Sequence, residues 1–311
     1  MPPSSPPGAG PSEPVLRHRR VLFGIAAFAM VLLFGVYLCA VRTPWGQRLD
    51  ATAIRGRLVL SRHDIRVAAR LHTTIDIASV ALLGGAVVLV AFLRGRRRLM
   101  LGVGVLMMGS LATTETLKRV LGRPRLAATD PLRYLPTFPS GHTTIAMALS
   151  VGALFVAPRR YRTAVAVAGV VFAAAVGCSV VVTASHRPSD AIGATLVVTA
   201  WAAVIAAFLL RAEPSRAGRP AWLRLSPWMA LAGISLLSAA FVIVVVVALA
   251  IHRGRLDAIE IGHAFVGAAS AIVGTILLCV ATLLIALHDV DLDRPGRGRA
   301  ETRTPAAVTA S

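Results

Sequence analysis

The chain has 311 residues, of which 56% are hydrophobic and 15% are charged, and its formal net charge is +19. A mean hydropathy of +0.72 and apolar runs long enough to cross a bilayer indicate an integral membrane protein and exclude an ordinary soluble domain. The 32 arginines and the single lysine lie between these runs, not in one stripe with interleaved aromatic residues, which argues against nucleic-acid binding and favours topology signals and contacts with membrane lipids.

The chain begins with a segment rich in Pro, Ser and Gly, and we expect residues 1–20 to form a disordered cytoplasmic tail. The apolar run 21–41 is too long for a signal-peptide core and predicts the first spanning helix. Residues 42–70 are rich in arginine and do not span. The later part of that segment suits an amphipathic helix at the membrane interface.

Seven more apolar runs follow, at 71–93, 99–117, 143–157, 163–184, 190–210, 228–251 and 262–287. The sequence therefore predicts an all-α membrane protein with about eight transmembrane helices. We expect one membrane domain, with a six-helix core over residues 21–211 and two additional helices within 212–287. Residues 288–311 are polar and are expected to form a second disordered cytoplasmic tail.

The arginine pattern predicts the orientation in the membrane. Lysine and arginine divide almost evenly, 18 against 15, between the two alternating sets of connecting segments. They are densest in the very short connections at 94–98 and 158–162, where the positive-inside rule is most reliable. We therefore expect both termini in the cytoplasm and the alternate connections on the outer face.

Three polar clusters, at 118–125, 139–142 and 186–190, stand at the ends of apolar runs. With the predicted topology, all three lie on the outer face. Cations and histidines gathered where the hydrocarbon ends predict an anion-binding site at one face of the membrane.

The first cluster combines two cations. Lys118 is expected to be the last helical cation of its run, because Gly122 and Pro124 interrupt the helix and let Arg125 fold back toward the same anion. Glu115 lies three residues before Lys118 and is expected to pair with it. The alternative is that the cluster consists of interfacial charges that reach the headgroups.

The second cluster precedes an apolar helix. Ser140 is a natural N-cap, and the free backbone N–H groups of the turn can point toward phosphate oxygens. Gly141 lets the backbone approach an anion closely. An ordinary capped helix start with an interfacial His142 is the alternative.

The third cluster pairs a histidine with a carboxylate. Asp190 follows His186 by four residues at the start of a helix, with Pro188 in its first turn. The carboxylate can accept one imidazole N–H and leave the other nitrogen free as a nucleophile. The alternative is a structural His–Asp pair.

Three further groups have simpler explanations. His72 and Asp76, near the outer end of the second helix, could line the pocket, but interfacial placement is simpler. A three-residue spacing relates Asp257, Glu260 and His263. A chance arrangement of these side chains on a loop is favoured over a cation-binding site. The cysteines, which are Cys39, Cys178 and Cys279, lie in apolar runs and suggest neither a disulfide framework nor a metal site.

Taken together, the clusters resemble the type 2 phosphatidic-acid phosphatase superfamily, the lipid phosphate phosphatases. The family pattern is Lys-x6-Arg-Pro, then Pro-Ser-Gly-His, then Ser-Arg-x5-His-x3-Asp. The matching residues in this chain are Lys118, Arg125, Pro139, Ser140, Gly141, His142, Ser179, His186 and Asp190. Order, spacing and membrane context together make the resemblance specific, whereas each motif alone is weak.

The resemblance implies a phosphohistidine mechanism that requires no metal or other cofactor. His186 would attack phosphorus, Asp190 would orient it, and His142 would protonate the leaving oxygen and later help to activate water. The phosphoryl oxygens would be held by a further set, which comprises Lys118, Arg125, Ser140 and Gly141.

The chain departs from the family pattern at two positions, with Leu126 in place of proline and Val180 in place of arginine. A lost guanidinium contact to phosphate is worth about 1.5–3 kcal/mol. We expect another arginine, either Arg187 or Arg123, to replace it.

The expected function is hydrolysis of a lipid phosphate such as phosphatidic acid, or of a polyprenyl diphosphate such as undecaprenyl diphosphate, at the outer membrane face. Two alternatives are phosphoryl or head-group transfer to an acceptor other than water, and a non-catalytic lipid-phosphate binder or transporter that lacks the arginine at 180. The eight apolar runs exclude a soluble haloperoxidase relative. Neither the lipid nor the oligomeric state follows from the sequence.

Overall fold

The computed structural model describes residues 13–74, 77–127, 130, 132, 135–210 and 221–287. Within these ranges the protein is helical and contains no β-strand. The α-helices are α1 (Glu13–Val36), α2 (Pro44–Arg55), α3 (Arg62–Thr74), α4 (Ile77–Leu93), α5 (Arg97–Leu121), α6 (Gly141–Val156), α7 (Arg162–Val182), α8 (Pro188–Leu209), α9 (Ala221–His252) and α10 (Ala258–Ala286). The short segments are the π-helical η1 (Tyr37–Val41) and the 3₁₀ turns η2 (Gly56–Val59) and η3 (Arg159–Tyr161).

Six helical segments in the described ranges are long and apolar enough to cross a membrane: α1 with η1, α5, α7, α8, Leu225–His252 of α9, and α10. Two of the eight expected spans are shorter. Helix α6 has 16 residues, and the described apolar part of α4 is Leu82–Leu93. In its described residues the protein is therefore an all-helical, multi-span membrane protein with six candidate spans, where the sequence predicted about eight.

The expected second span is divided between two described helices. Helix α3 ends at Thr74 and α4 begins at Ile77. None of the α3 residues is buried, and Arg62, Arg66 and Arg70 recur every four residues along it. The amphipathic helix expected in the arginine-rich segment is thus α3, which extends four residues beyond residue 70 and includes His72.

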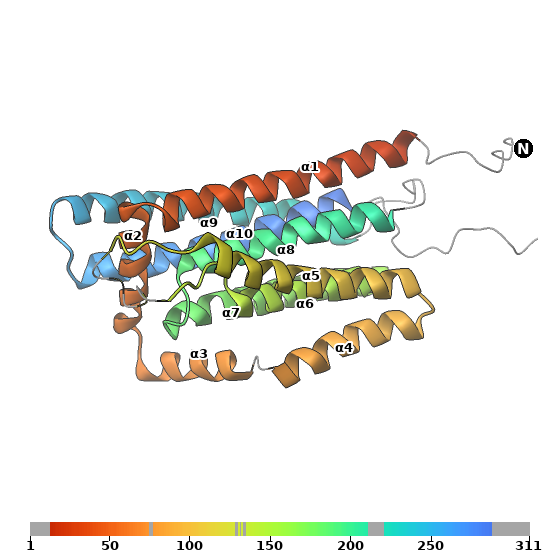
Figure 1. The fold of residues 1–311 in the computed structure, drawn as a ribbon, viewed down its shortest axis with the longest axis horizontal. Coiled ribbons are helices and arrows are strands. Elements are labelled where there is room, and N and C mark those ends of the chain that lie inside the picture. Colours follow the sequence, from red (N-terminus) through yellow and green to blue (C-terminus); the bar gives the residue numbers. More distant parts are fainter. Residues whose placement is uncertain are drawn as a thin grey trace, which may run out of the picture.

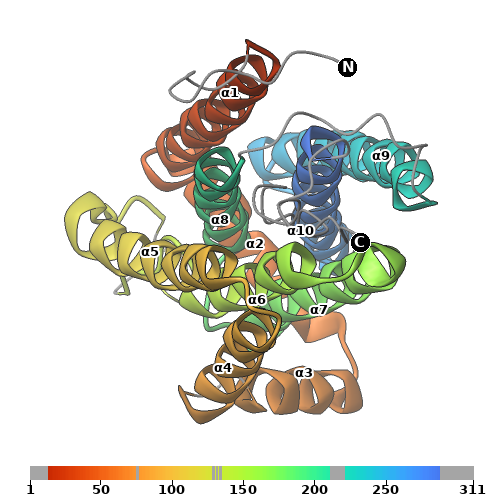
Figure 2. The same ribbon diagram turned by 90° about the vertical axis from the view of Figure 1, so that its right-hand side faces the viewer.

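The long helices run side by side along the molecule, and α2 crosses them at one end (Figure 1). Viewed down the bundle, α8 lies inside, with α1, α5 and α10 around it (Figure 2). Helix α8 packs against α1, α5, α6 and α10 and is the most buried of the candidate spans, whereas α9 packs mainly on α10 and is the least buried. Because α10 also packs on α2, α7 and α8, the last two helices are joined to the rest of the bundle.

At the end of the bundle opposite α2, arginine side chains donate hydrogen bonds to the last backbone carbonyls of two helices. The Arg19 side chain donates to the Leu210 carbonyl at 2.9 Å, and Arg94 donates to the Val156 carbonyl at 2.8 Å. These carbonyls belong to the last turns of α8 and α6, where no intrahelical donor is available and the helix dipole favours cations. Part of the large arginine content is therefore used to close helix ends.

Helices α9 and α10 approach each other through two glycines. A Cβ atom added at Gly233 would lie 3.0 Å from the Gly274 carbonyl oxygen, and one added at Gly274 would lie 3.0 Å from the Gly233 oxygen. Small residues let membrane helices pack backbone against backbone, where dispersion contacts are densest. This pair sets the distance between α9 and α10.

Replacing Gly274 by leucine tests this packing. The new side chain would meet the α9 backbone, which cannot move aside cheaply, so we expect a loss of about 1–3 kcal/mol in stability. Thermal unfolding in detergent, followed by tryptophan fluorescence, measures the change. The control is Gly104→Leu on α5, where an added Cβ meets nothing within 4 Å. Equal melting temperatures for the two variants would show that the glycine contact does not hold the helices together.

Candidate active site

The structure brings the three predicted clusters together at the end of the bundle crossed by α2. Lys118 lies in the last turn of α5, residues 140–142 begin α6, and Asp190 lies in the first turn of α8. The Ser140 N–H donates to the Asp190 carbonyl at 2.9 Å, and the rings of His142 and His186 are 6.1 Å apart. Segments that are up to 72 residues apart in the chain therefore form one polar site.

Ser140 caps α6, as its position in the sequence predicts. Its Oγ accepts the Thr143 N–H at 3.4 Å and the Thr143 hydroxyl at 3.2 Å, and the residue is fully buried. The hydroxyl is thus used in the cap. What the turn offers to an anion is the set of backbone N–H groups at the start of α6.

Lys118 lies directly over this turn. A Cβ atom added at Gly141 would be 3.3 Å from the Lys118 Nζ, so a larger residue here would crowd the ammonium group. The Nζ donates to Glu115 Oε1 at 2.6 Å, which confirms the predicted pair. An anion bound to Lys118 would share or displace this carboxylate.

His186 and Asp190 form the pair predicted from their spacing. The distance from His186 Nδ1 to Asp190 Oδ2 is 3.5 Å, which is long for a hydrogen bond. The same oxygen accepts the Thr137 hydroxyl at 2.5 Å and the Arg187 N–H at 2.9 Å, and Asp190 is fully buried. The carboxylate is therefore fixed in place, and the imidazole lies next to it.

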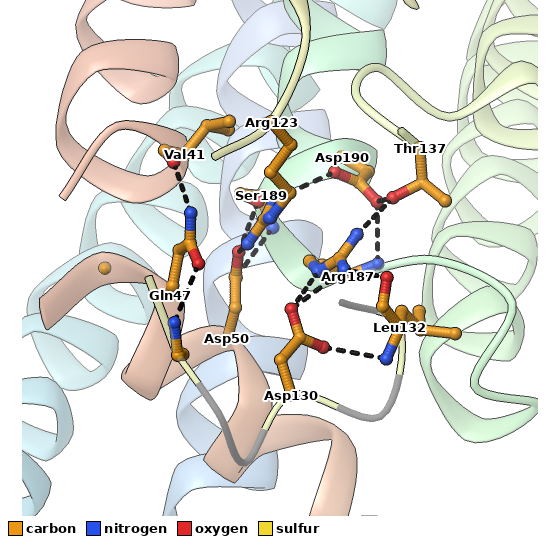
Figure 3. A network of polar contacts seen from close by, with 12 residues as sticks. Val41, Gln47, Asp50, Arg123, Asp130, Leu132, Thr137, Arg187, Ser189 and Asp190 are labelled. Atoms are coloured by element: carbon orange, nitrogen blue, oxygen red, sulfur yellow. Dashed lines mark hydrogen bonds and ion pairs between the residues drawn. The ribbon is translucent and has the colours of Figure 1, made fainter. Parts of the chain in front are cut away.

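Arg187 does not serve as the expected replacement for the arginine missing at 180. Its side chain is fully buried and every guanidinium nitrogen has a partner. Nε and Nη2 contact Asp130 Oδ2 at 2.9 and 2.8 Å, Nη1 donates to Thr137 Oγ1 at 2.6 Å, and Nη2 donates to the Leu132 carbonyl at 2.5 Å (Figure 3). Arg187 thus holds the loop before α6, and it has no donor left for phosphate.

Arg123, the other expected replacement, lies behind the orienting carboxylate. Its Nη2 donates to Asp50 Oδ2 at 3.1 Å, and its Nη1 is 3.9 Å from Asp190 Oδ1 (Figure 3). Burial raises the pKa of Asp50, while the neighbouring Arg123 acts in the opposite direction. Asp50 also accepts the Ser189 hydroxyl at 2.6 Å, so α2 is tied to the start of α8.

Gln47 of α2 shapes the loop that follows α5. Its amide nitrogen donates to two carbonyls and its amide oxygen accepts two N–H groups, all at 2.7–3.2 Å, and the partners are Val41, Pro124, Leu126 and Ala127. Neither Gln47 nor Asp50 belongs to the predicted clusters. Their three-residue spacing on one helix face is the only pattern that points to them.

Arg125 and Val180 complete the predicted set. Arg125 is exposed on the loop after α5. Val180 is fully buried in α7, and its carbonyl accepts the N–H groups of Ser185 and His186 at 3.0 and 3.1 Å. The valine thus helps to fix the turn that carries His186, but it supplies no charge.

A third histidine joins the site from α3. The His72 ring packs on the His142 ring with centroids 4.1 Å apart and planes inclined by 34°. His72 thus lies against the site, as the sequence allowed, while Asp76 lies outside the described residues. Among those residues no group of three His, Cys, Asp or Glu side chains is arranged to hold a metal, and Asp257 and Glu260 cap the start of α10.

The Asp130→Asn variant tests the structural role of Arg187. Removing one charge of a buried ion pair leaves the other uncompensated, so we expect a loss of about 3–5 kcal/mol in the free energy of unfolding. Thermal or denaturant unfolding in detergent measures the loss. Asp64→Asn is the matched control, because Asp64 is exposed on α3. A loss no larger than that of the control would contradict the assignment.

Comparison with known proteins gives a family match over residues 99–214, which fit the PAP2 superfamily model. No curated protein and no solved structure matches the chain. The matched range begins in α5, ends just after α8 and contains all three clusters. The chain therefore contains a PAP2 superfamily domain at residues 99–214, the superfamily that its motifs predict.

Proposed function

We propose that the protein is a membrane phosphatase that hydrolyses a lipid phosphate or a lipid diphosphate through a phosphohistidine. The observation that supports this most directly is the arrangement of His186. His186 lies beside the fixed carboxylate of Asp190, and its ring faces the ring of His142. The N-terminus of α6, over which Lys118 lies, is next to these groups. A nucleophile, its orienting group, a proton donor and an anion site are thus all present in one place.

In the first step, the Nε2 lone pair of His186 attacks phosphorus. The bond from phosphorus to the leaving oxygen breaks, and that oxygen takes the bond's electron pair and a proton from His142. Asp190, on the Nδ1 side at 3.5 Å, holds the proton on Nδ1 and stabilises the positive charge that the ring gains.

In the second step, water replaces the histidine. His142, now neutral, accepts a proton as the water oxygen attacks phosphorus. The phosphorus–nitrogen bond breaks, its electron pair returns to His186, and inorganic phosphate leaves. His142, which enters the cycle protonated, thus gives up one proton in the first step and regains one from water in the second, and the resting site is restored.

The phosphoryl oxygens are held by Lys118, by Arg125 and by the N–H groups at the positive end of α6. These groups act by position and charge on a loose, in-line transfer. Arg187 is not available in place of the arginine missing at 180, because Asp130 and the loop before α6 hold its guanidinium. Arg123 is tied to Asp50 through Nη2, while its Nε and Nη1 have no hydrogen-bond partner among the described residues.

We place the site on the extracytoplasmic face and both termini in the cytoplasm. The support is the arginine-dense connections at 94–98 and 158–162, which lie at the end of the bundle opposite the site (Figure 1). With this orientation the site meets the headgroups of the outer leaflet.

Replacing His186 by asparagine tests the nucleophile. We expect phosphate release from phosphatidic acid or undecaprenyl diphosphate, with EDTA present, to fall at least about 10³-fold, because no other group can take the phosphoryl. With labelled substrate, the wild type should hold an acid-labile phosphoryl group that the variant lacks. Unchanged turnover in a folded His186→Asn protein would rule out the mechanism.

Lys118→Ala tests the anion site. Loss of one charge-assisted contact should lower kcat/KM by about 10- to 100-fold. Arg119→Ala is the matched control, because Arg119 is the next residue on α5 and is exposed. Equal effects of the two substitutions would mean that only the general positive charge matters.

One observation favours a second candidate, a lipid-phosphate binder without turnover. Val180 stands where the family pattern has an arginine, and its buried side chain supplies no phosphate contact. A binder, however, would need no pair of facing histidines. Lipid-phosphate binding that persists in His186→Asn, without turnover in the wild type, would establish this alternative.

A further inference from the structure

We propose that His72 binds the leaving group of the substrate, and that it makes the site prefer lipid diphosphates to lipid monophosphates. The inference rests on the proposed function. In a diphosphate the group that leaves is itself a phosphate ester and is anionic. In a monophosphate it is a neutral alcohol.

The position of His72 follows from two ring contacts. The His142 and His186 ring centroids are 6.1 Å apart with the planes inclined by 64°, and the His142 and His72 centroids are 4.1 Å apart in a tilted stack. His142 is thus the ring that touches both others. His72 comes from the last turn of α3, outside the matched domain at 99–214.

The geometry of phosphoryl transfer places His72 on the leaving-group side. The nucleophile and the leaving oxygen lie on opposite sides of phosphorus in an in-line reaction. His186 is the nucleophile, and His142 protonates the leaving oxygen, so His142 marks the side from which the product departs. A ring stacked on His142 therefore borders whatever is attached to that oxygen.

The chemistry of His72 suits an anionic group. Its Nδ1 is buried and has no hydrogen-bond partner among the described residues. A buried polar nitrogen is costly to leave unpaired, and a phosphoryl oxygen would satisfy it. Burial and the neighbouring His186 lower the pKa of His72, and an anion bound beside the ring would act in the opposite direction.

The competing explanation is that His72 only holds the His142 ring in place. A positioning residue affects the proton donor, so its loss would slow both classes of substrate alike. A residue that binds the leaving group affects mainly the substrate whose leaving group carries charge. The ratio of the two rates therefore separates the explanations.

The experiment compares farnesyl diphosphate with farnesyl monophosphate, which share one lipid chain, in detergent micelles. His72→Phe keeps a ring for stacking but removes both nitrogens, and His72→Lys keeps a cation. We expect His72→Phe to lower the diphosphate-to-monophosphate ratio of kcat/KM about tenfold, by loss of the diphosphate reaction. We expect His72→Lys to retain most of the ratio. His63→Phe, at an exposed position on the same helix, should leave it unchanged.

An unchanged ratio in His72→Phe, or an equal fall with both substrates, would overturn the inference and leave the phosphatase standing. A folded wild type that turns over neither lipid would overturn the proposed function, and the inference with it. If His72→Phe does not elute as a single species, His72→Leu answers the same question, because it also lacks a polar nitrogen.

Discussion

The Asp190 carboxylate is the group on which the geometry of the site depends. One of its oxygens accepts from Thr137 and from the Arg187 N–H and lies 3.5 Å from His186, while the other faces Arg123. The backbone of the same residue accepts the N–H of Ser140. One buried side chain thus fixes the start of α8, the loop before α6 and the imidazole between them.

The buried charges around Asp190 alternate in sign. Five charged side chains are largely buried and are connected by ion pairs or hydrogen-bonded groups (Figure 3). In order, they are Asp50, Arg123, Asp190, Arg187 and Asp130. Each charge would be expensive alone, so neighbours of opposite sign are what make the burial tolerable. The same pairing explains why these arginines cannot move to a phosphate. Withdrawing either one would leave a carboxylate unpaired in the interior.

The helices before the matched domain build the walls of the site. Helix α2 lies across the end of the bundle, where Gln47 holds the loop after α5 and Asp50 holds Arg123. Helix α3 stops short of α4 and brings His72 onto His142. Residues 42–74 thus contribute contacts to the site that the domain at 99–214 provides.

The sequence by itself determined the helical membrane class, the family and the convergence of three clusters, because long apolar runs and fixed motif spacings are local properties of the chain. It also determined the Ser140 cap and the Glu115–Lys118 pair, which depend on residues only three apart. Only the tertiary structure decided what Arg187 contacts, since Asp130 lies 57 residues away and no spacing encodes that pair. The divided second span and the stacking of His72 on His142 were likewise decided by packing between distant helices, to which hydropathy is blind.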